Sequence, residues 1–156
     1  MTLGLFLIQA LNGLQLGLLL FLLAAGLTLV FGIMNFVNLA HGSLYMMGAY
    51  IAAAVFNASD SFVLAGVVAV PATMLLGMIV ERVALSRLYQ RDHLDQVMAT
   101  FGLILFFNEL VRIIWGPAAV YMNAPEALSG SVMLFGIGYP SYRFAIIAVE
   151  IGRAHV

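Results

Sequence analysis

The stretch from Met1 to Ser59 contains no Asp, Glu, Lys or Arg. At about 1.5 Å per helical residue, it is long enough to cross a hydrocarbon core of about 30 Å more than twice. Only 8% of the whole chain is charged, whereas a soluble domain averages about 25%. No positive charge precedes the apolar residues, so we expect no cleavable signal peptide. The sequence therefore predicts an all-α, polytopic membrane protein.

About four to five transmembrane or half-membrane helices are expected, one of them broken near residues 32–43. Glycine and proline positions and the lengths of the apolar runs set their limits. The predicted helices are Leu3–Phe31, a half helix over Ser43–Phe56, Phe62–Val80 with Pro71 inside it, Val97–Trp115, and a last one that begins at Arg143 and loses its apolar pattern at Glu150. Between the last two, residues 118–142 are expected to form an external segment interrupted by Pro and Gly.

Polar side chains gather at the predicted break. Asn35, Asn38 and His41 are three residues apart, a spacing that places them on one face of a helix. Gly42 is expected to permit the break, and Tyr45 follows one turn later. Amide and imidazole groups can replace the hydrogen bonds that a polar solute loses in hydrocarbon, so this face is a candidate translocation path. The alternative is that these residues cap the broken helix and tie it to its neighbours.

The charged residues indicate orientation. Three arginines lie between the predicted third and fourth helices, and the short turn at 57–61 has none, so the positive-inside rule places the arginine segment in the cytoplasm. The expected cytoplasmic loop residues are Glu81, Arg82, Arg87 and Arg91. Glu109 and Arg112 are three residues apart in the last predicted span and are expected to form an intramembrane ion pair. That pair is either structural or part of a conduit.

The sequence lacks the motifs that several kinds of binding and catalysis require. The chain has no Cys and no Lys, and a phosphate-binding Walker A loop requires Lys. His41, His93 and His155 show no metal-ligand spacing, so no metal site is predicted. No Gly-x-Ser-x-Gly elbow occurs, and no catalytic residue is assigned. The formal net charge of −1 indicates no nucleic-acid partner. We therefore expect a transport subunit that is not itself an enzyme.

The last residues have an unusual possible origin. The common sequencing adapter AGATCGGAAGAGCACACGTC, read from its third base, translates as the sequence of Ile151–Val156. Its first two bases would complete a Glu codon, which accounts for Glu150. We hypothesise that residues 150–156 are not native and that residues 1–149 are a partial domain. The alternative is a genuine charged terminus.

The residues around the break resemble a known family. Asn35-Phe-Val-Asn-Leu-Ala-His-Gly-Ser-Leu-Tyr-Met-Met-Gly-Ala-Tyr50 is similar to the Asn-Phe-Ala-His-Gly-x-x-Tyr-Met-x-Gly-Ala-Tyr signature of LivH-type branched-chain amino acid ABC-importer permeases. The resemblance also includes Asn12–Gly17 and the run from Glu81-Arg82 through Asp92–Gly102 to Trp115-Gly116, and it spans essentially Met1 to Val149. Two departures are Leu39, where the family often has Phe, and Ser86–Tyr89, where it often has an Arg-Pro-Leu-Arg-like segment.

The resemblance implies an importer in the bacterial inner membrane with a multi-pass permease that works by alternating access. It implies a second homologous permease, two ATPase subunits that hold ATP and Mg, a periplasmic binding protein and surrounding lipid. It also implies roughly twice this length, so that the chain would be an N-terminal half without a cofactor of its own. Alternatives are a related permease for urea, amides or other small solutes, an ATP-independent channel or secondary carrier, and a passive structural subunit. The substrate and the side of the N-terminus stay open.

Overall fold

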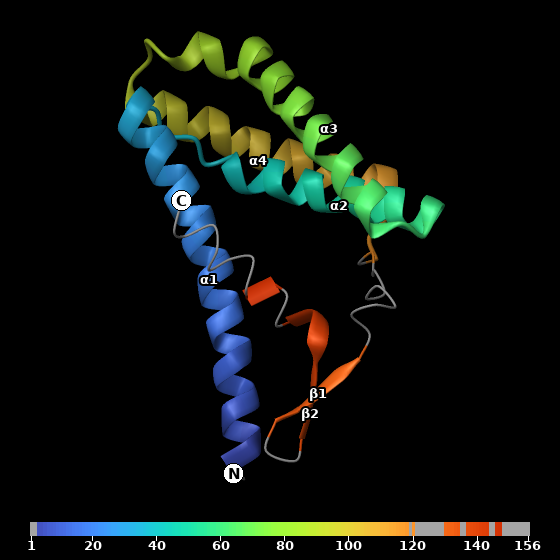
Figure 1. The fold of residues 1–156 in the computed structure, drawn as a ribbon. Helices are drawn as coiled ribbons and strands as arrows, with labels where there is room; N and C mark the ends of the chain where they lie inside the picture. Colours follow the sequence, from blue (N-terminus) through green and yellow to red (C-terminus); the bar gives the residue numbers. More distant parts are fainter. Residues whose placement is uncertain (1–2, 119, 121–129, 135–136, 144–145, 148–156) are drawn as a thin grey trace. The chain divides into compact units, whose positions relative to one another are not determined.

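The computed structural model describes residues 3–118, 120, 130–134, 137–143 and 146–147 (Figure 1). The described part is predominantly helical, which confirms the all-α class. Its elements in chain order are α1 (Leu3–Met34), α2 (His41–Ser59), α3 (Phe62–Val83), the 3-10 helix η1 (Leu85–Leu88), α4 (His93–Trp115), β1 (Ser131–Leu134) and β2 (Ile137–Pro140). The chain forms two compact units, one of residues 27–122 and one of residues 1–26 with 123–156.

Within the described residues, α1, α3 and α4 are long and apolar enough to cross a membrane. The predicted break is also present, because residues 35–40 separate α1 from α2. The helix predicted over Ser43–Phe56 is longer in the structure, where α2 begins at His41 and ends at Ser59. With 19 residues, α2 is about 28 Å long, and polar residues occupy both of its ends.

Two residues in left-handed backbone conformations set the helix boundaries. Asn35 (φ 49°) ends α1, and its N–H donates to the Phe31 carbonyl at 2.8 Å. Asp60 (φ 51°) ends α2 in the same way, since asparagine and aspartate tolerate this conformation better than most residues. Ser61 then caps α3, its Oγ accepting from the Leu64 N–H at 3.3 Å. Gly42 lies inside the first turn of α2, just after the break, and the expectation that it permits the break stays a prediction.

The hydrophobic core of the 27–122 unit joins α2, α3, α4 and the segments that connect them. Within this unit α2 packs against α3 and α4. The buried members of the core are Phe36, Met47, Val80, Leu85, Phe107 and Val111. Residues of the break and of η1 are therefore part of the same core as the helices, which places the break firmly against its neighbours.

A close contact between α2 and α3 depends on a missing side chain. A Cβ added at Gly48 would lie 2.9 Å from Thr73 Oγ1, which donates to the Ala69 carbonyl at 2.7 Å. Small residues allow helix backbones to approach each other closely in membranes. Gly48 therefore sets the distance between α2 and α3.

The other unit contains a hairpin that the sequence did not predict. In the segment expected to be irregular, β1 pairs antiparallel with β2, Ser131 opposite Pro140 and Leu134 opposite Ile137. The N–H and Oγ of Ser141 both donate to the Gly130 carbonyl, at 2.9 and 2.8 Å. Arg143 Nη1 donates to Asn12 Oδ1 of α1. The helix predicted to follow Arg143 lies largely, and residues 150–156 lie entirely, outside the described residues.

We expect Gly48→Ala to destabilise the chain by about 1 kcal/mol. Overpacking costs about 1–3 kcal/mol, and the better helix propensity of alanine recovers only about 1 kcal/mol. Thermal unfolding in detergent micelles measures the change. Gly66→Ala is the matched control, because nothing lies within 4 Å of a Cβ at Gly66. Removing the obstructing hydroxyl in Gly48→Ala/Thr73→Ala should restore stability, and equal stability of the two single variants would contradict the packing argument.

Candidate functional site

The polar residues at the break do not share a helical face, so this part of the prediction was wrong. Asn35 turns the chain out of α1, residues 36–40 are non-helical, and α2 begins at His41. Asn35 is exposed, whereas Asn38 is buried and His41 is half-buried. The structure thus brings these side chains into one connection but gives them different environments.

Asn38 organises the backbone of the break. Its Oδ1 accepts from the Ala40 N–H at 3.1 Å, and its main-chain oxygen accepts from the His41 N–H at 3.4 Å. Side-chain-to-backbone bonds of this kind stabilise turns that precede helices. Asn38 therefore has a local structural role at the start of α2. One turn into the helix, Tyr45 is 51% exposed.

A buried glutamine that sequence reasoning did not single out holds the break in place. Gln96, in the first turn of α4, is only 2% exposed. Its Oε1 accepts from the Val37 N–H at 3.2 Å. Its Nε2 donates to the carbonyls of Leu88 at 3.3 Å and Arg91 at 3.0 Å. The side chain therefore joins the break, the segment around η1 and α4.

The signal for this residue was present in the sequence. Gln96 and Thr100 are four residues apart, and both belong to the segment Asp92–Gly102 that carries part of the resemblance. Thr100 is fully buried, and its Oγ1 donates to the Gln96 carbonyl at 2.8 Å. Two polar side chains on one face of an apolar helix need partners, and here Gln96 finds them in the backbone of Val37, Leu88 and Arg91.

The break begins beside the arginine segment. The Phe36 ring meets the Tyr89 ring edge to face, with centroids 5.2 Å apart. Tyr89 Oη donates to Glu81 Oε1 at the end of α3, at 2.9 Å. The expected loop residues Glu81, Arg82, Arg87 and Arg91 are all exposed. The start of the break and the connection between α3 and α4 therefore lie at the same end of this unit.

Desolvation raises the pKa of the Tyr89 phenol above its usual value of 10, and so do the hydrogen bond to Glu81 and the charge of that carboxylate. Ionising the phenol would remove the donated proton and place two negative charges side by side. The contact therefore involves neutral Tyr89 at every physiological pH.

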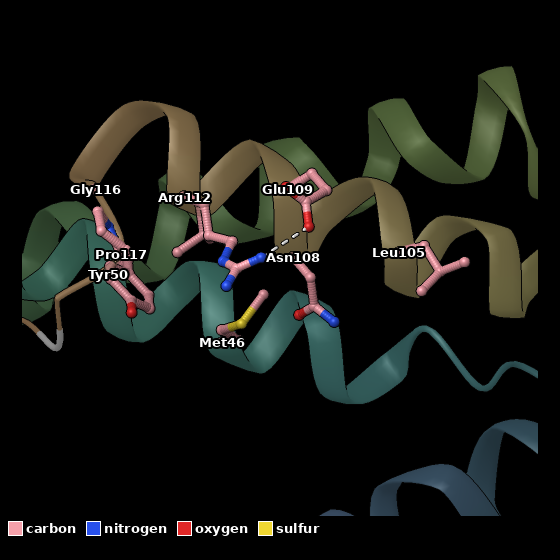
Figure 2. A pocket seen from close by; sticks show the side chains of 9 residues that line it. Met46, Tyr50, Leu105, Asn108, Glu109, Arg112, Gly116 and Pro117 are labelled. Atoms are coloured by element: carbon pink, nitrogen blue, oxygen red, sulfur yellow. Dashed lines mark hydrogen bonds and ion pairs between the residues drawn. The ribbon is translucent and has the colours of Figure 1, made fainter.

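The predicted pair Glu109–Arg112 is present at the other end of α4. Arg112 Nη1 donates to Glu109 Oε1 at 3.2 Å, and the two side chains are 64% and 65% exposed. The pair lines a pocket of about 390 Å³ between α2 and the second half of α4 (Figure 2). The other lining residues are Met46, Tyr50, Leu105, Asn108, Val111, Gly116 and Pro117.

The described residues contain no group of three or more His, Asp or Glu side chains that could hold a metal ion. The break offers amides, a phenol and an imidazole for hydrogen bonding, and the pocket offers an ion pair.

Comparison with known proteins gives the family. Residues 9–149 match the family model described as the branched-chain amino acid transport system / permease component. The chain belongs to this family. It is 33% identical to the high-affinity branched-chain amino acid transport system permease protein BraD of Pseudomonas aeruginosa over 120 residues, which are 69% of this chain and 38% of BraD. It is 34% identical to the permease protein LivH of Escherichia coli K12 over 134 residues, 80% of this chain and 43% of LivH.

The chain thus spans about two fifths of the length of these curated relatives. No solved structure matches it. Family membership and the three apolar helices together identify a multi-pass protein of the bacterial inner membrane.

Replacing Gln96 by Leu should lower the stability of the 27–122 unit by about 1–3 kcal/mol. The Val37 N–H loses its acceptor and two carbonyls lose a donor, and each buried unpaired group has a cost of that order. Hydrogen–deuterium exchange in detergent should rise first at residues 36–40. Gln90→Leu is the matched control, because Gln90 is exposed in the same connection. Unchanged exchange in Gln96→Leu would show that the break does not depend on this side chain.

The pH response of Tyr89 is a separate test. Because its pKa is raised in the folded chain, the contact contributes fully below the ordinary tyrosine pKa of about 10 and is lost as the pH rises through the raised value. The difference between ultraviolet titrations of the original chain and Tyr89→Phe isolates this phenol. We expect its ionisation above pH 10, and ionisation at or below that value would argue against the bond to Glu81.

Proposed function

We propose that this chain is the N-terminal half of a permease subunit in an ABC importer for branched-chain amino acids, and that it contributes part of the translocation path. The observation that carries the proposal is the family match over residues 9–149, which includes both the polar break and the ion-pair pocket. The names of BraD and LivH, which specify branched-chain amino acid transport, support this substrate class.

The proposed assembly contains a second homologous permease, two ATPase subunits that hold ATP and Mg, a periplasmic binding protein and membrane lipid. The large exposed apolar side chains on α1, α3 and α4 are suited to contact with lipid and with the second permease. In this arrangement ATP hydrolysis takes place on other chains, and this chain moves the solute.

The proposed mechanism is alternating access. Binding of ATP closes the ATPase subunits, the two permeases rock against each other, and the solute passes from the outer to the cytoplasmic side. The exposed Arg82, Arg87 and Arg91 are expected at the cytoplasmic surface by the positive-inside rule. Asn35, His41 and Tyr45 are the break residues with side chains available to a passing solute, while Asn38 maintains the backbone around them.

Two other functions use the same fold. A related importer for urea or amides would have the same partners and a different binding protein. An ATP-independent channel or carrier would transport without an ATPase. Uptake into vesicles with and without the ATPase subunits distinguishes the importer from the carrier, and competition between leucine and urea distinguishes the two importers.

Substitutions at the break distinguish a path role from a packing role. In the assembled transporter, His41→Ala should leave the amount of assembled protein unchanged and lower leucine uptake about tenfold or more, because a hydrogen-bonding group is lost from the path. Asn38→Ala should instead reduce the assembled protein, because the Ala40 N–H loses its partner. Quantitative membrane immunoblots and vesicle uptake measure the two effects. Normal uptake by assembled His41→Ala would remove this residue from the path.

The hypothesis that residues 150–156 derive from an adapter stays a prediction. These residues lie outside the family match, which ends at residue 149.

A further inference from the structure

The pocket between α2 and α4 combines apolar walls with two opposite charges. Met46 of α2 and Leu105 and Val111 of α4 supply apolar surface. In Figure 2 the side chains of Asn108, Glu109 and Arg112 extend from α4 toward the α2 side of the pocket. Its volume of about 390 Å³ lies within the range of about 300–1,000 Å³ found for small-molecule sites.

The ion pair uses little of its hydrogen-bonding capacity inside the described part of the chain. A guanidinium has five N–H donors and a carboxylate has two acceptor oxygens. Here the contact among described residues is one bond, from Arg112 Nη1 to Glu109 Oε1. About two thirds of each side chain is exposed. Charges on a membrane-spanning helix normally face a cavity or another protein, since exposure to lipid is costly. The pair is therefore suited to a polar ligand.

We propose that this pocket binds the zwitterionic head group of an apolar amino acid. The α-carboxylate accepts hydrogen bonds from Arg112, the α-ammonium donates to Glu109, and the aliphatic side chain lies against Met46, Leu105 and Val111. A guanidinium is well suited to a carboxylate because it can donate two parallel hydrogen bonds. The Glu109–Arg112 pair and the zwitterionic amino acid each have a net charge of zero, so binding adds no net charge to the membrane. This inference rests on the proposed function for its substrate class.

The position of the pocket suits a site that the solute meets first. It lies at the C-terminal half of α4, away from the arginine connection that precedes this helix. If that connection faces the cytoplasm, the pocket faces the periplasm, and Trp115 is placed at the membrane interface that tryptophan favours. From the pocket, α2 leads back from Tyr50 to His41 and the polar break. The solute thus meets the ion pair before it reaches the break.

The absence of Cys from this chain permits a direct test. Leu105→Cys, at a position 53% exposed in the pocket, introduces the chain's one thiol; Leu64→Cys in the first turn of α3, 47% exposed, is the matched control. Each variant is placed in the assembled transporter and labelled with a small neutral methanethiosulfonate reagent. Labelling rates are measured with leucine, with isoamylamine, which lacks the carboxylate, and with isocaproate, which lacks the ammonium. Leucine uptake is measured on the same preparations.

We expect leucine to slow labelling at position 105 and not at position 64, and the two single-charge analogues to protect weakly. Glu109→Gln or Arg112→Gln in the Leu105→Cys chain should raise the half-protecting leucine concentration about tenfold or more, as the loss of a charged hydrogen bond predicts. Asp60→Asn, which removes a carboxylate from the exposed turn between α2 and α3, should leave protection unchanged.

Three results would overturn the inference. The first is leucine uptake without protection at position 105, which leaves the proposed function intact. The second is equal protection by leucine and the two analogues. The third is a thiol that stays unlabelled in the complex and reacts only in the separated chain, which would show that a partner subunit covers the pocket. Protection without leucine uptake would support the site and instead contradict the proposed importer function.

Discussion

The side-chain amide of Gln96 is the interaction on which the arrangement of the 27–122 unit depends. Backbone that leaves a helix within a membrane protein needs hydrogen-bond partners from the protein itself, because hydrocarbon supplies none. Gln96 accepts from Val37 in the break and donates to Leu88 and Arg91 near η1. One buried residue thereby satisfies backbone groups from two connections and anchors both to α4.

This arrangement gives the two ends of the unit different chemistry. At one end, Phe36 and Tyr89 pack the break against the arginine connection. Toward the other, α2 and α4 form a pocket with apolar walls and the Glu109–Arg112 pair. The first half of α2, from His41 to Tyr50, extends between them, and the close approach of α2 to α3 depends on Gly48. A solute that is received at the ion pair and released beside the arginines would pass along the first half of α2.

The candidate site was only partly predictable. The Glu109–Arg112 pair follows from a spacing of three residues on one regular helix, and the structure contains it. The common face of Asn35, Asn38 and His41 was wrong because that spacing has meaning only while the helix continues, and Asn35 adopts a left-handed conformation. Gln96 was missed because its three backbone partners, Val37, Leu88 and Arg91, lie in two connections outside the long helices, and pattern analysis does not show which helix such connections lie against.

The sequence by itself determined the class of protein. A charge-free stretch from Met1 to Ser59, long apolar runs and an arginine-rich connection predict membrane helices and their orientation, because the bilayer constrains composition and periodicity directly. Only the tertiary structure decided that residues 36–40 are non-helical, which polar side chain holds them and that α2 and α4 line a pocket beside the ion pair. These features depend on contacts between residues far apart in the chain, such as Val37 with Gln96 and Met46 with the second half of α4, and local sequence does not specify such contacts.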